Sequence, residues 1–214
     1  MDEEISIINE KTRNERIKIF FIDNKKKIIT FFFLILIVFI GFFGVKEYKD
    51  SKKKKISDEF NSVVIDYSSE NLDLTKERLK SIVKQKDPTY SPLSLYFIID
   101  NDLAESREEV NKLFNILINK TNLKDEIKSL IIYKKALYNA DFIDEDELLD
   151  IVRPILNSKS IWKSHTLYLV AEYFYSKDEK KKSKEFFDQI ISLDDSNQDI
   201  LKETQKRLNR DFSE

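Results

Sequence analysis

Few side chains in this sequence have the types and spacing that catalysis or metal binding requires. His165 is the only histidine, and no nucleophile or second metal ligand stands near it in the sequence. We therefore expect it to be an ordinary residue on a helix face. Residues 144–150 are densely acidic, but no glycine stands where a calcium-binding loop needs its sharp turn. Asp144, Glu145 and Asp146 are better explained as N-terminal helix charges that the macrodipole stabilises.

The residue types that the chain lacks exclude other chemistry. It has no cysteine, which excludes disulfide bonds, thiolate catalysis and Cys-ligated zinc. Its two glycines, Gly41 and Gly44, leave residues 45–214 without any, so a glycine-rich phosphate-binding loop is excluded there. The net charge of −2 favours neither polyanions nor acidic substrates, so we expect no nucleic acid partner. We expect a protein that is not an enzyme and that holds neither a cofactor nor a metal ion.

The dominant feature is an apolar stretch at residues 28–45, which has no charged side chain and follows Lys25, Lys26 and Lys27. As a helix it would be roughly 27 Å long, about the thickness of the hydrocarbon core of a bilayer. A buried core helix of this length would normally have a polar face. A cleaved signal peptide is disfavoured, because residues 41–46 offer no small-x-small cleavage site. We predict a single transmembrane helix.

This anchor divides the chain into a tail at residues 1–27, the transmembrane helix at 28–45 and one domain at 46–214. Basic residues are balanced on the two sides of the span, so charge does not set its orientation. Position alone favours a signal-anchor with the N-terminus in the cytoplasm.

Beyond the anchor the apolar spacing is helical. Ile56, Phe60, Val63, Val64 and Tyr67 fall at i, i+4, i+7, i+8 and i+11, on one face of a helix. Similar stripes continue to residue 210. Because tight hairpin turns between strands depend on Gly or Asn, the missing glycines also favour an all-α domain.

The helical stripes repeat along the chain. Val63, Ile98, Ala136 and Ala171 form a column with steps of 35, 38 and 35 residues. Three further columns share this register: Thr75, Val110, Leu148 and Ser183; Leu79, Phe114, Val152 and Phe187; and Ile82, Leu117, Ile155 and Ile190. The repeat predicts about four helical hairpins, with residues 199–210 as a solvent-facing cap helix.

These columns resemble tetratricopeptide repeats, in which two antiparallel helices cross at small residues twelve positions apart. The fourth unit fits best, with Ala171 and Ser183 at the crossing. The pairs at the first two crossings are bulkier, so we expect those hairpins to pack further apart. Pro154 should kink or shorten its helix, because it removes a backbone donor.

The order of acidic tail, single span, degenerate repeats and cap resembles the bacterial tetratricopeptide-repeat-like family of ancillary Sec-translocon subunits. The resemblance implies a protein of the bacterial inner membrane, with the N-terminus in the cytoplasm and the repeat domain, an α-solenoid, in the periplasm. It implies a non-enzymatic protein–protein interaction module whose partners are the Sec translocon, periplasmic chaperones or emerging polypeptides. The alternative hypothesis is a homo-oligomeric cell-envelope scaffold without a role in secretion.

In the repeat frame, the first helix of each unit lines a concave groove. Its fifth and twelfth positions carry aromatic residues in most units, namely Phe60, Tyr67, Tyr133, Tyr168 and Tyr175. Such a groove could hold a peptide through apolar contact and the hydroxyl tips of the tyrosines. The alternative is that these rings fill space between the helices.

Overall fold

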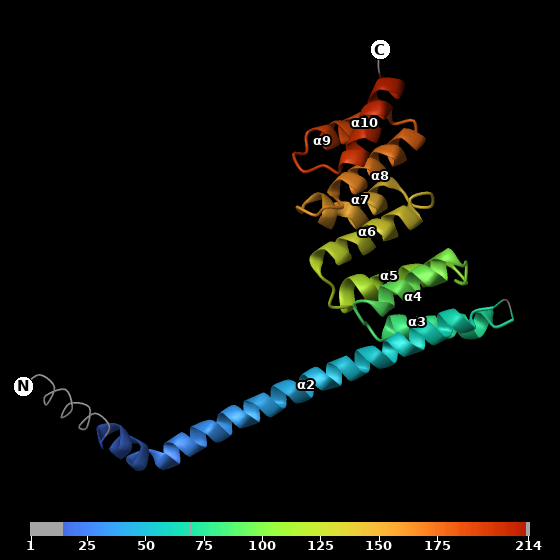
Figure 1. Cartoon of the computed structure of the whole chain (residues 1–214). Coiled ribbons are helices and arrows are strands. Elements are labelled where there is room, and N and C mark those ends of the chain that lie inside the picture. The colour runs from blue at the N-terminus through green and yellow to red at the C-terminus, as the bar shows by residue number, and fades with distance from the viewer. Residues whose placement is uncertain (1–14, 69, 213–214) are drawn as a thin grey trace, which may run out of the picture. The chain divides into compact units, whose positions relative to one another are not determined.

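The computed structural model describes residues 15–68 and 70–212, and every regular element within them is a helix (Figure 1). The all-α prediction is confirmed. Residues 15–23 are helical and Asn24 is a turn residue, while the first part of the predicted tail, residues 1–14, lies outside the described residues. The helices that follow are α2 (Lys25–Asp66), α3 (Leu72–Lys84), α4 (Tyr90–Asp100), α5 (Arg107–Lys120), α6 (Asp125–Asn139), α7 (Glu145–Leu156), α8 (Lys163–Ser176), α9 (Lys180–Ile191) and α10 (Gln198–Asp211).

The chain divides into two compact units, Met1–Lys55 and Ile56–Glu214. The first contains most of α2, which is long and apolar enough to cross a membrane and whose 18-residue apolar window is 0% buried. The apolar stretch of residues 28–45 lies within this helix, and α2 continues to Asp66 without a break. A helix satisfies its backbone hydrogen bonds internally and leaves its apolar side chains free to contact lipid, which is what a membrane-spanning segment needs.

Side-chain caps start several helices of the second unit. Asp144 accepts a hydrogen bond from the backbone N–H of Glu147, 2.9 Å away, and so caps α7. Ser106 caps α5 in the same way, and Asn197 caps α10. The prediction that the acidic run marks a helix N-terminus is therefore confirmed for Asp144.

After three helices, a residue other than glycine adopts the left-handed backbone conformation. Lys86, Asp102 and Asp178 have φ values of 59°, 52° and 61° and stand two residues after the ends of α3, α4 and α8. At Asp178 the backbone follows the Schellman pattern, with Glu179 N–H donating to Phe174 and Asp178 N–H to Tyr175. A side chain with a Cβ is strained in this conformation.

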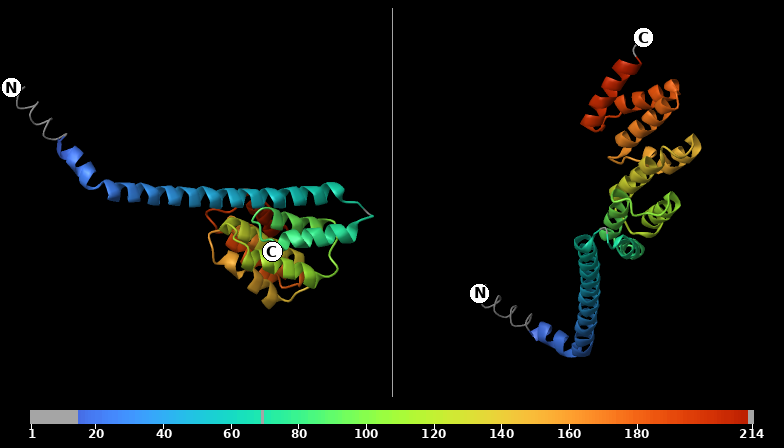
Figure 2. Two further views of the ribbon diagram at one scale, coloured as in Figure 1. Left: turned by 90° about the horizontal axis from the view of Figure 1, so that it is seen from below. Right: turned by 90° about the vertical axis from the view of Figure 1, so that its right-hand side faces the viewer.

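The helices of the second unit follow one another in chain order, and each packs on the next (Figures 1 and 2). Alternate helices also meet, which gives two layers. In one layer α6 packs on α8 and α8 on α10, and in the other α3 packs on α5. An ion pair of 2.6 Å between Lys182 and Glu145 joins α9 to α7 within the second layer.

The predicted columns lie in the core. All sixteen positions are buried, and the most exposed of them, Thr75, has 3% of its surface accessible. Pro154 lies in the last turn of α7, which ends at Leu156. The buried apolar residues form three clusters in succession, one from the end of α2 to α6, one from α6 to α8, and one from α8 to α10.

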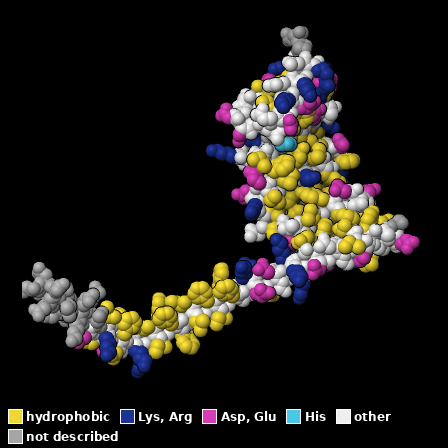
Figure 3. All heavy atoms as spheres, in the orientation of Figure 1, with side chains coloured by type: hydrophobic (Ala, Val, Ile, Leu, Met, Phe, Trp, Pro, Cys, Tyr) yellow, Lys and Arg dark blue, Asp and Glu magenta, His cyan; other side chains and the backbone are white. Residues whose placement is uncertain are grey.

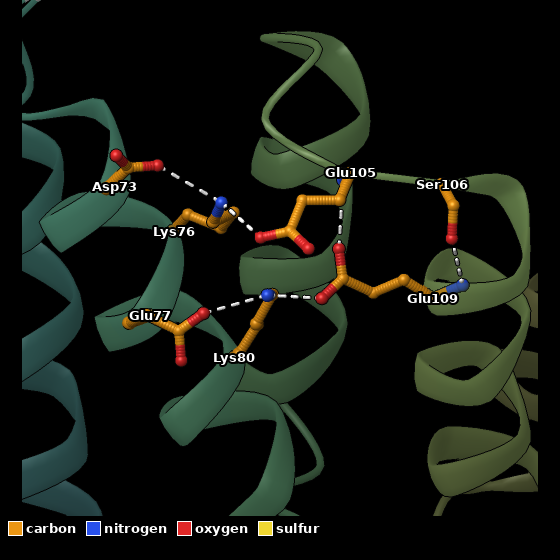
Figure 4. A network of polar contacts seen from close by, with 7 residues as sticks. All are labelled: Asp73, Lys76, Glu77, Lys80, Glu105, Ser106 and Glu109. Atoms are coloured by element: carbon orange, nitrogen blue, oxygen red, sulfur yellow. Dashed lines mark hydrogen bonds and ion pairs between the residues drawn. The ribbon is translucent and has the colours of Figure 1, made fainter.

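Two buried lysines of α3 join that helix to α5 and to the turn before it (Figure 4). Lys76 lies 2.7 Å from the carboxylate of Glu105, and Lys80 pairs with Glu109. The hydrogen bonds that Lys76 donates to Glu105 and Asp73 raise its pKa. Burial alone would lower the pKa of Lys80, but its hydrogen bonds with two glutamates outweigh that effect and raise it. Both lysines are therefore charged and paired at neutral pH.

Candidate protein-binding surface

The five aromatic residues predicted to line a groove are all half-buried, and each meets a ring of a different helix or connecting turn. At the N-terminal end, Phe60 contacts Tyr90 with ring centroids 5.7 Å apart. Tyr67 meets Phe97 edge-to-face at 5.2 Å. These contacts join the segment from Ile56 to Tyr67 to α4.

Tyr168 and Tyr175 face the C-terminal end. Tyr168 meets the fully buried Phe187 of α9 edge-to-face at 5.5 Å. The guanidinium of Arg207 lies 4.4 Å from the ring centroid of Tyr175, which also contacts Phe212. Arg207 is itself buried and donates to the Glu172 carboxylate at 2.5 and 2.7 Å. The helix α10 and the residue after it therefore occupy the surface around Tyr175.

Tyr133 lies among aromatic rings at the start of α8. Its ring stacks on that of Trp162 at 5.9 Å, with 20° between the planes. His165 lies 5.1 Å from Trp162 and 6.1 Å from Tyr133. All three side chains are half-buried. The three rings join α6 to the start of α8, and stacking of this kind holds them in fixed positions.

The electrostatics of this cluster follow from its partial burial. Burial raises the pKa of Tyr133 and lowers that of His165. Because both shifts favour the uncharged form, the cluster is neutral at pH 7. It is thus an apolar surface with polar tips.

Exposed aliphatic residues extend this cluster. Ile161, next to Trp162, is 67% exposed, and Leu137, one turn beyond Tyr133 on α6, is 51% exposed. Figure 3 shows hydrophobic side chains gathered over α4 and α6 on this side. The ring of Tyr96 on α4 lies under the ammonium of Lys134, 4.6 Å from its centroid. We call this surface the aromatic face and define it as Tyr96, Tyr133, Leu137, Ile161, Trp162 and His165.

Sequence reasoning found part of this surface. It predicted Tyr133 for the groove and placed His165 on a helix beside Trp162, but it did not connect that pair with Tyr133, and it did not single out Ile161 or Tyr96. Trp162, Ile161 and Tyr96 fall outside the fifth and twelfth positions of the repeat frame. The available signal was local, because the only tryptophan of the chain stands beside an exposed isoleucine and three residues before the only histidine.

Within residues 15–68 and 70–212, no group of three or more His, Asp or Glu side chains could hold a metal ion. The chain matches no protein-family model, no curated protein and no solved structure.

Proposed function

We propose that this chain is a single-span membrane protein whose helical unit binds other polypeptides through the aromatic face and has no catalytic role. Exposed apolar patches on soluble domains mark binding sites, and Tyr and Trp are enriched among residues that dominate binding energies. The observation that carries the proposal is the stacked, half-exposed pair of Tyr133 and Trp162 beside the 67% exposed Ile161.

The architecture that we propose for the helical unit is a tetratricopeptide-repeat-like α-solenoid of about four hairpins with α10 as its cap. Its support is the sixteen-position register, which is buried throughout, together with the two layers of alternate helices. In such arrays each unit contacts its neighbours only, and the layer of first helices forms an extended binding surface. Tyr133 and Trp162 stand on that layer, at the junction of α6 and α8.

For the membrane and the partner, we propose the bacterial inner membrane, with the N-terminus in the cytoplasm and the helical unit in the periplasm. The partners would be the Sec translocon and the chaperones or polypeptides that meet it there. This part rests on the resemblance in domain order to ancillary translocon subunits. The aromatic face fits it, since emerging polypeptides expose the apolar segments that a neutral aromatic surface can bind.

The test is site-specific photocrosslinking in intact cells, with a benzophenone amino acid at Leu137 in the full chain. We expect adducts with translocon components or with newly exported polypeptides, and loss of these adducts in an Ile161→Asp variant. Leu74→Asp is the matched control, because Leu74 is 60% exposed on α3 in the other layer. Adducts with a second copy alone would instead support the envelope scaffold, and protease accessibility of the helical unit from the cytoplasm would contradict the periplasmic location.

Alanine at Tyr133 separates binding from packing. We expect Tyr133→Ala to weaken crosslinking strongly and to lower the melting temperature only slightly, because its ring is partly exposed beside the exposed Leu137 on α6. Tyr175→Ala should do the reverse, since Arg207 and Phe212 cover it. A lowered melting temperature with unchanged crosslinking for Tyr133→Ala would show that its ring only fills space.

A further inference from the structure

The residues just after the apolar stretch of α2 form a cationic surface with a defined geometry. Residues 46–55 carry six lysines, and α2 continues through them without a break. Because a helix turns ~100° per residue, Lys46, Lys49, Lys52 and Lys53 fall within an arc of roughly 120°. Glu47 and Asp50 lie outside this arc. We call these four residues the lysine face.

The lysine face lacks the partners that other lysines of this chain have. All four side chains are exposed, and none forms an ion pair within residues 15–68 and 70–212. By contrast, the buried Lys76 and Lys80 each contact two carboxylates. Figure 3 shows Lys and Arg atoms directly beyond the end of the apolar part of this helix. Because none of the four pairs with the neighbouring Glu47 or Asp50, their charge is available to attract an external counter-charge.

The distance to the membrane identifies that counter-charge. If Val45 ends the span, Lys46 to Lys53 lie about 2–12 Å further along the helix axis, at ~1.5 Å per residue. The headgroup layer is roughly 5–7 Å deep on each side. The remaining distance is within the Debye length of about 8 Å at physiological salt. Lysine side chains also reach toward the interface while their stems follow the helix.

We propose that the lysine face binds the headgroups of anionic phospholipids and so gathers these lipids around the anchor. This inference rests on the proposed function in one respect, namely that α2 spans a bilayer. Basic clusters that directly flank a span recognise anionic lipid through the charge of its phosphate, and the attraction falls off within a Debye length. Because α2 is helical throughout this segment, the four ammonium groups are presented on one side together.

The experiment measures lipid enrichment around the full-length protein by energy transfer. Because the chain has no cysteine, Ser51→Cys gives a single donor site at the same level of α2, on the side of the helix away from the four lysines. The protein is reconstituted into vesicles of mixed phosphatidylcholine and phosphatidylglycerol that contain a trace of either lipid labelled on its acyl chain. We expect transfer to labelled phosphatidylglycerol to exceed transfer to labelled phosphatidylcholine by about twofold or more. The ratio should fall to about one in 1 M salt, where the Debye length is ~3 Å.

Two variants with the same change in charge make the test specific. In the first, Lys→Gln changes at all four positions of the lysine face should bring the ratio to one. The second changes four exposed lysines of the helical unit to Gln and should leave the ratio unchanged: Lys120, Lys124, Lys128 and Lys159. An equal loss in both variants would overturn the inference, because it would show an effect of net charge alone.

Failure of the inference can be distinguished from failure of the span. A protein that floats with pure phosphatidylcholine vesicles but shows a ratio of one in mixed vesicles is anchored without anionic lipid recognition, which overturns the inference alone. A protein that does not float with phosphatidylcholine vesicles has no span, which overturns both the inference and the membrane part of the proposed function.

Discussion

Truncation of Phe187 tests whether the helical unit is built from separable parts. Phe187 is fully buried in the C-terminal cluster, where its ring meets those of Tyr168 and Phe212 at 5.5 and 5.9 Å. Since the other two clusters are formed by different buried residues, Phe187→Ala should destabilise α8 to α10 while the N-terminal helices keep their packing. Arrays in which each unit contacts only its neighbours are expected to behave in this way.

The expected loss of stability in Phe187→Ala can be compared with the total stability of α8 to α10. Phe→Ala in a packed core costs about 3–5 kcal/mol. Folded domains are stable by roughly 0.05–0.15 kcal/mol per residue, so the ~50 residues of α8 to α10 account for about 2–7 kcal/mol. The substitution therefore removes most of the local stability. Amide hydrogen exchange in α9 should accelerate about 10²- to 10⁴-fold, because 1.4 kcal/mol corresponds to a factor of ten.

Hydrogen exchange followed by mass spectrometry locates the effect. We expect peptides of α3 and α5 to exchange as in the wild type when Phe187 is changed. The matched variant is Phe114→Ala, which removes a fully buried ring from the N-terminal cluster. It should accelerate exchange in α3 and α5 and leave α9 as in the wild type. If both variants accelerated exchange equally throughout the unit, the three clusters would form one cooperative core and the repeat reasoning would be refuted.

Three further predictions concern single side chains. In urea denaturation, Lys80→Ala should lower the free energy of unfolding by about 1–3 kcal/mol, because it leaves the largely buried carboxylate of Glu109 without its cation. Lys206→Ala removes an exposed ion pair and should lower it by less than about 1 kcal/mol. Asp178→Gly should raise the melting temperature, since glycine removes a strain of about 1 kcal/mol at a φ of 61°. The fluorescence of Trp162, 5.1 Å from His165, should titrate with a midpoint below pH 6.5, because burial lowers the pKa of that imidazole.

The sign of the pH effect on stability follows from the same shift. As the pH falls through 6.5, the unfolded chain takes up the proton of His165 before the folded chain does, so stability decreases toward lower pH. In His165→Gln the fluorescence transition should disappear. A fluorescence midpoint above pH 6.5 would contradict the burial of His165. Equal losses of unfolding free energy for Lys80→Ala and Lys206→Ala would show that burial of the Lys80 pair is unimportant. A lower melting temperature for Asp178→Gly would exclude strain at that turn.

The helices and their buried faces could be predicted from the sequence because both follow from local rules. Apolar residues at helical spacing identify the side of each helix that is buried, and the register of the hairpins follows from the columns through Val63, Ile98, Ala136 and Ala171. The length of α2 was less evident from the sequence. The change from apolar to charged residues at Lys46 predicted the end of the transmembrane segment, but the helix continues to Asp66 because lysine favours helix and no Gly or Pro follows before that residue.

The partners of the aromatic rings could not be predicted in the same way, because they depend on how separate helices cross. The repeat frame gave Tyr133 and Tyr175 the same expected role at its fifth and twelfth positions, yet Trp162 stacks on the first and Arg207 contacts the second. Trp162 precedes its helix, and Arg207 stands in the cap helix, so neither belongs to the repeat pattern. Burial of a ring between helices depends on tertiary packing, which the spacing of apolar residues along the sequence does not predict.

The two interpretations of the predicted groove, peptide binding and packing between helices, lead to different expectations for Tyr133 and Tyr175. Tyr175 contacts both the guanidinium of Arg207 and the ring of Phe212, so we expect it mainly to stabilise the junction with α10. A ring that is fixed by one neighbour and open on its other side loses little conformational entropy on binding, which is the condition for a strong contact. We propose that Tyr133 meets this condition, because Trp162 stacks on it and part of its surface stays exposed. Binding should therefore concentrate where α6 meets α8, with the outer units acting as the scaffold that holds this junction.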